Sequence, residues 1–119
     1  MKRIVGIIGI ILALATPINA GDWMREDTYR ELAWTALLAV DYMQTRTIVQ
    51  NPDKYFEYNP IIGKHPSQKN VDIYMASCAI IHPVISYYLP PKYRKVWQYV
   101  TIGIELGAVG NNLRIGVSF

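Results

Sequence analysis

Residues 78–91, CAIIHPVISYYLPP, decide how this chain folds. The stretch begins as an apolar helical pattern and ends at Pro90 and Pro91, which cannot continue a helix and so force a turn. Pro83 lies inside the pattern and is predicted to kink the helix, because its ring clashes with the carbonyl four residues before it. His82 precedes it, and a titratable ring in such an apolar stretch needs a polar partner.

Two further helical patterns flank this stretch. The first is stopped by Asn51 and Pro52, and the last starts with a proline in its first turn. The tail LRIGVSF alternates apolar and polar residues, which predicts a short C-terminal strand. We therefore expect an all-α chain, a three-helix bundle with a kinked second helix. It forms one domain over residues 21–119, with helices at about 26–49, 71–89 and 92–111 and an irregular loop at 50–70.

The first twenty residues have the layout of a secretory signal peptide. Lys2 and Arg3 precede an apolar core, and a small residue, Ala20, stands at the expected cut. We expect export and cleavage after Ala20, the alternative being an uncleaved anchor. Removing Lys2 and Arg3 from the 12 basic residues leaves ten against nine acidic ones. No basic stripe remains, so nucleic acid is not an expected partner.

The composition favours a membrane location. Hydrophobic residues make up 51% of the chain and charged residues 18%, which is unusual for a small soluble domain. The second and third helical segments are candidate spans, and aromatic residues gather near their ends as they do at membrane interfaces. We expect the cell envelope, the inner membrane in particular, with the lipid bilayer as partner. The alternative is a secreted soluble bundle whose apolar helices form its core.

The third helical segment has two distinct faces. At 100° per residue, one stripe holds the polar residues Arg94, Gln98, Thr101, Glu105 and Asn112. The opposite face holds Gly103, Gly107 and Gly110, and such small residues let another helix approach closely. That helix belongs to this chain, to a second copy in a homo-oligomer, or to a membrane protein partner.

Acidic and basic side chains also interrupt apolar faces on the other helices. Asp41 shares its face with Trp34 and Ile48, and His82 shares its face with Met75 and Ser86. An unpaired acid inside an apolar helix costs about 3 kcal/mol on insertion scales. We therefore expect His82 to bind Asp41, Glu105 or both, within an internal network that fixes the helix register. The predicted network comprises Asp41, Thr45, Glu57, Asn59, His82, Gln98, Thr101, Glu105 and Asn112.

Two short motifs carry a resemblance to a known family. DYMQT (residues 41–45) and EYNPIIG (residues 57–63) resemble the Asp-x-x-x-Thr and Glu-x-Asn-Pro signature of small bacterial and phage-borne helical membrane proteins of unknown function. The match covers about 25 of 119 residues and singles out Asp41, Thr45, Glu57, Asn59 and Pro60. The resemblance implies no activity.

The sequence predicts a small exported structural or interaction component of the inner membrane. The competing hypothesis is a membrane-associated enzyme, or a proton- or ion-coupled element, with Asp41, Glu57, His82 and Glu105 as candidate catalytic residues. One histidine with carboxylates is a weak metal signal, and Cys78 is the only cysteine, so neither a metal nor a disulfide is expected. No nucleophile, phosphate or dinucleotide motif occurs, and no cofactor is expected.

Overall fold

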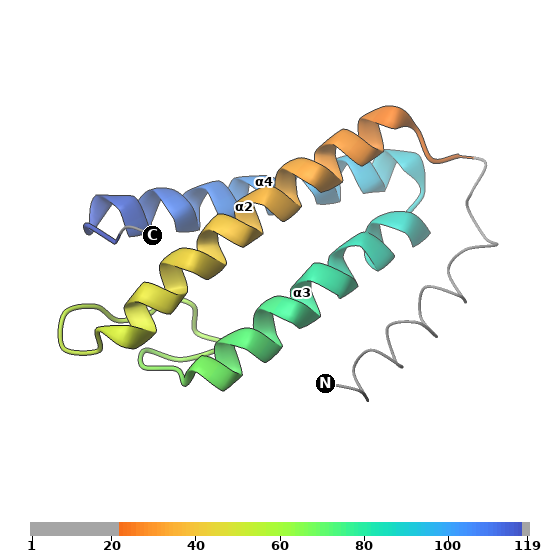
Figure 1. Ribbon diagram of the computed structural model, residues 1–119. Coiled ribbons are helices and arrows are strands. Elements are labelled where there is room, and N and C mark those ends of the chain that lie inside the picture. Colours follow the sequence, from red (N-terminus) through yellow and green to blue (C-terminus); the bar gives the residue numbers. More distant parts are fainter. Residues whose placement is uncertain (1–21, 118–119) are drawn as a thin grey trace.

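The computed structural model describes residues 22–117, which form three helices (Figure 1). They are α2 (Arg25–Gln50), α3 (Gln68–Tyr88) and α4 (Pro91–Arg114). The predicted all-α, three-helix bundle is confirmed, and every helix boundary lies within three residues of its predicted position. The predicted signal peptide and its cleavage site lie outside the described residues.

Local contacts explain where the helices begin and end. The Asp27 carboxylate accepts a hydrogen bond from the Met24 N–H at 2.8 Å, which satisfies a free donor at the start of α2. The Ser67 hydroxyl accepts from the Asn70 N–H at 3.1 Å and caps α3. Pro83 lies inside α3, which runs on to Tyr88 before the two prolines end it.

Helix α2 is the centre of the bundle. It packs against both α3 and α4, whereas α3 and α4 touch each other little and diverge along their length (Figure 1). The main apolar core joins α2 to α3 through Trp34, Leu38, Val71 and Met75. This core is small, because the buried residues among 22–117 comprise seven apolar and nine polar or charged side chains. Polar contacts therefore hold much of the interior together.

The predicted C-terminal strand is wrong for the part of the tail that the structure describes. Helix α4 continues through Arg114, and a turn follows in which Gly116 has a positive φ of 90°, a conformation that favours glycine. The Val117 N–H then donates to the Asn112 carbonyl at 2.9 Å. Val117 packs with Ile48 and Tyr55, so the tail closes the end of the bundle. No strand occurs in residues 22–117, and Ser118 and Phe119 lie outside them.

The connection between α2 and α3 is folded back on itself. The Glu57 N–H donates to the Lys64 carbonyl at 2.8 Å, and the Gly63 N–H donates to the Asn59 carbonyl at 3.1 Å. Gly63 has a φ of 82°, which explains the choice of glycine at this turn. This short excursion brings Glu57 and Asn59 against the bundle.

Within the described residues, 17 large apolar side chains are exposed on the surface of the bundle. Across residues 22–117, no helix combines the length and the hydropathy needed to cross a membrane, and this includes the two segments that composition marks as candidate spans.

Candidate functional site

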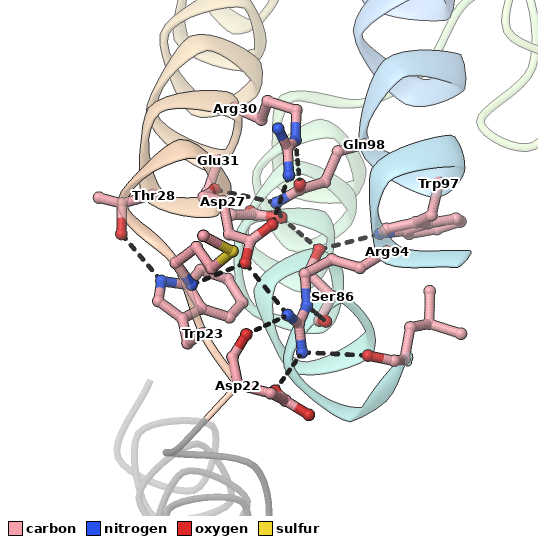
Figure 2. A network of polar contacts seen from close by, with 12 residues as sticks. Asp22, Trp23, Asp27, Thr28, Arg30, Glu31, Ser86, Arg94, Trp97 and Gln98 are labelled. Carbon is pink, nitrogen blue, oxygen red and sulfur yellow. Dashed lines mark hydrogen bonds and ion pairs between the residues drawn. The ribbon is translucent and has the colours of Figure 1, made fainter. Parts of the chain in front are cut away.

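The first polar cluster is built around Arg94, in the first turn of α4 (Figure 2). Arg94 is fully buried, and its guanidinium donates to the carbonyls of Ser86, Tyr87 and Leu89 at 2.6, 3.2 and 3.0 Å. These carbonyls belong to the end of α3, where the helix leaves its last acceptors free. Arg94 therefore replaces the missing helical donors and fixes the turn between α3 and α4.

The same guanidinium also reaches the start of α2. It donates to the Asp27 carboxylate and to the Asp22 carboxylate, each at 3.1 Å, and it stacks over the Trp23 ring (Figure 2). Asp27 is buried and is also paired with Arg30. One side chain thus joins all three helices at this end of the bundle.

His82 lies beside this cluster and contacts Glu31 and Thr101. Its Nδ1 is 3.0 Å from Glu31 Oε2, and its Nε2 is 2.7 Å from Thr101 Oγ1. The ring is stacked between two indoles, with centroids 3.7 Å from Trp34 and 4.8 Å from Trp97. The expectation that His82 binds Asp41 or Glu105 is therefore wrong, because α3 places the ring level with the start of α2.

Glu31, His82 and Thr101 follow one another as the acid, imidazole and hydroxyl of a hydrolase triad do. Their hydrogen bonds differ from those of such a triad. The Thr101 hydroxyl lies 2.8 Å from the Trp97 carbonyl and 3.1 Å from the Gln98 carbonyl, so backbone acceptors of its own helix compete for its proton. The Glu31 carboxylate accepts from Gln98 and Ser86 and faces the other ring nitrogen. Both ring nitrogens are thus engaged with protein side chains, and the arrangement suits a structural network.

The second polar cluster is an acidic cavity of about 360 Å³ at the other end of the bundle. Its walls carry Asp41 from α2, Glu57 from the loop and Glu105 from α4. The Asp41 and Glu105 carboxyl groups hydrogen-bond to each other, which requires a proton on one of them. Asp41 Oδ1 also accepts from Asn112 Nδ2 at 3.3 Å.

Glu57 completes the cavity from the loop. Its Oε1 accepts the Asn59 N–H at 3.1 Å, whereas its Oε2 is buried and has no hydrogen-bond partner. Burial raises the pKa of the Glu57 carboxyl above its usual range, and the neighbouring Asp41 carboxyl adds to that shift. Glu105 Oε2 is likewise buried and receives no protein donor apart from the proton it can share with Asp41.

None of the described residues that line this acidic cavity is basic. The ion pairs found between side chains of residues 22–117 all belong to the Arg94 end of the bundle. Within the same residues no group of three or more His, Cys, Asp or Glu side chains could hold a metal ion. The cavity is therefore electronegative, and its carboxyl groups are arranged around it without forming a metal centre.

The structure divides the predicted site residues between these two clusters. Asp41, Thr45, Glu57, Asn59, Glu105 and Asn112 line the acidic cavity, as does Pro60 of the second motif. His82, Gln98 and Thr101 lie in the Arg94 cluster. The sequence reasoning missed the α2 partners of that cluster, above all Asp27 and Glu31. Glu31 lies four residues after Asp27 and three residues before Trp34. This helical spacing is the signal that could have placed both acids on the buried face of Trp34.

The glycine face of α4 makes no contact within the described chain. A Cβ atom added at Gly103, Gly107 or Gly110 would meet nothing within 4 Å. The alternative that this face packs against another helix of the same chain is therefore wrong for residues 22–117. Contact with a second copy or another protein stays a prediction.

No protein-family model, curated protein or solved structure matches the chain. The fold and its contents define a three-helix bundle with a polar interior, closed at one end by Arg94 and hollowed at the other by an acidic cavity. The resemblance to small helical membrane proteins stays a prediction.

Proposed function

We propose that this protein is an exported, helical component of the bacterial inner membrane that acts as a structural or interaction component. The observation that carries the proposal is an uncharged band around the outside of the bundle. The band comprises residues 27–45 of α2, 73–88 of α3 and 96–113 of α4, and no exposed residue in it is charged.

Exposed charges gather beyond the two edges of the band. One end of the bundle carries Arg25, Glu26, Lys92 and Lys95. The other end carries Arg46, Asp53, Lys54, Lys64, Lys69, Asp72 and Arg114. Between these ends the exposed side chains are apolar, small, tyrosine or threonine, such as Leu32, Ile81 and Leu106. A solvated helical bundle would normally distribute its charges along the helices.

The dimensions of the band suit a bilayer. Its three segments contain 19, 16 and 18 residues, or about 24–29 Å of helix at 1.5 Å per residue. The hydrocarbon core of a bilayer is about 30 Å thick. Tyr29, Tyr88 and Tyr99 are exposed towards one edge of the band, where tyrosine is favoured in interfacial regions.

The interior supports the same proposal. A helix's mean hydropathy counts its buried and exposed sides alike, and here the polar residues that lower it point inward. Glu31, Gln98 and Asn112 are buried and hydrogen-bonded across helices. Lipid facing the bundle would therefore meet mainly apolar groups, whereas these polar groups are hydrogen-bonded inside it.

Fractionation of the expressed full chain tests the proposal. Membranes are washed with alkaline carbonate, and the intact mass of the retained protein is measured. We expect retention in the washed membrane and a mass corresponding to residues 21–119. Release into the wash would overturn membrane embedding, and an uncleaved mass would overturn signal removal alone.

A matched pair of variants tests the band itself. Leu106→Glu places a charge on an exposed position inside the band, and Lys95→Glu changes an exposed position outside it. Lipid contact predicts that only Leu106→Glu reduces the membrane-retained fraction, because a charge in hydrocarbon costs free energy. Equal retention of both variants would mean that the band does not face lipid.

A further inference from the structure

The acidic cavity adjoins a second, apolar cavity between α3 and α4. This apolar slot has a volume of about 310 Å³, and its walls include Trp34, Ile81 and Trp97. Tyr74, Ile104 and Glu105 line both cavities, so the two meet at these residues. The slot exists because α3 and α4 make few contacts with each other.

We propose that the joined cavities bind an amphiphilic cation, with a protonated primary amine in the acidic cavity and its hydrocarbon chain in the apolar slot. The inference rests on the cavities alone and does not depend on membrane embedding.

The head group follows from charge and hydrogen bonding. Asp41, Glu57 and Glu105 face one cavity, and no described basic residue is paired with any of them. The buried Oε2 atoms of Glu57 and Glu105 lack a protein donor. A primary ammonium carries one positive charge and three N–H donors. It can therefore replace the proton held between Asp41 and Glu105 and also reach Glu57.

The tail follows from the shape and chemistry of the slot. The α3 residues that line it run from Tyr74 to His82, and eight residues of helix span about 12 Å. The polar ring of His82 at its wall is engaged with Glu31 and Thr101. The slot thus offers a medium-length alkyl chain an apolar wall, in the volume range of small-ligand sites.

Titration of the purified full chain with octylamine and with octanol tests the proposal. The two probes share the chain and differ in the head group, and the fluorescence of Trp34 and Trp97 reports occupation of the slot. We expect octylamine to bind at least tenfold more tightly than octanol, and methylamine, which lacks the chain, to bind at least tenfold more weakly than octylamine. Equal affinities for octylamine and octanol would overturn the proposal. They would mean that the carboxyl groups of the cavity bind protons and no ammonium group.

Two variants with matched controls assign the contacts. Glu57→Gln should remove the preference for the amine, whereas the exposed loop control Asp53→Asn should keep it. Cys78→Phe fills the slot and should weaken both probes, whereas Ala79→Phe on the next, exposed position should not. Circular dichroism checks that each variant keeps its helices. An amine preference that persists in folded Glu57→Gln would overturn the assigned head-group site, whatever the fractionation shows.

Discussion

Arg94→Lys is expected to destabilise the bundle strongly although it keeps the charge. The guanidinium faces six acceptors: the carbonyls of Asp22, Ser86, Tyr87 and Leu89 and the carboxylates of Asp22 and Asp27. A lysine ammonium has three donors, so at least three of these acceptors lose their partner. Each buried acceptor left unpaired costs about 1–3 kcal/mol. Only the bonds to the Ser86 carbonyl and the Asp27 carboxylate are buried, and water can reach the other, part-buried acceptors. The expected loss in the free energy of unfolding is therefore about 1–3 kcal/mol.

Thermal unfolding followed by circular dichroism measures this loss. For a domain of this size, a change of 1 kcal/mol shifts the melting temperature by about 4–8 °C, so we expect Arg94→Lys to melt about 4–24 °C lower. Arg114→Lys is the control, because Arg114 is exposed and bonds only the neighbouring Asn111 side chain. A decrease of less than about 4 °C for Arg94→Lys would refute the inference that this side chain holds the three helices together.

Three further predictions follow from the other cluster and the glycine face. Asp41→Asn should change the free energy of unfolding by less than about 1 kcal/mol, because the amide can donate to Glu105 in place of the shared proton. Chemical denaturation measures this change, and a large decrease would show that Asp41 is charged. Glu57→Gln should stabilise the protein at neutral pH and lose that advantage as the pH falls towards the ordinary value of 4.5, because the raised pKa of Glu57 means that folding favours its protonated form; melting curves over this range check it, and a constant difference would contradict it. Gly107→Leu should not lower the melting temperature, since nothing lies within 4 Å of an added Cβ and leucine favours a helix more than glycine does. It should lower the oligomer fraction seen by cross-linking, and an unchanged oligomer fraction would mean that the face makes no contact.

Periodicity was enough to predict the helices and the polar face of α4. Of its five residues, Arg94, Gln98 and Asn112 are buried and Thr101 and Glu105 are half-buried, because residues three, four and seven apart share one side of any helix. The same reasoning placed Asp41 beside Trp34 and Ile48 on the packed side of α2. Helix-internal geometry is set locally, so the sequence alone determines it.

The partners across helices depended on register, which periodicity does not provide. Helices α3 and α4 run antiparallel from the turn at Pro90, so a residue count from that turn places His82 level with Trp97. In the structure those two rings stack. The same count from the α2–α3 loop sets His82 level with residue 36 of α2, midway between Glu31 and Asp41. Counting residues therefore argues against Glu105 as the partner of His82 but does not choose between Glu31 and Asp41, and the contact with Glu31 is known only from the structure.

The two polar clusters differ in a way that separates their roles. In the Arg94 cluster the buried carboxylates of Asp27 and Glu31 are each matched by donors from another helix, and such a closed network specifies one arrangement of the helices. The acidic cavity has the opposite character, because its carboxyl groups face an open volume and two buried oxygens await a donor. Unpaired buried acceptors reduce stability, so a purely structural end of the bundle would be better served by apolar residues. The cost is explained if the cavity exchanges its proton for a cationic ligand, which is the role that the octylamine titration examines.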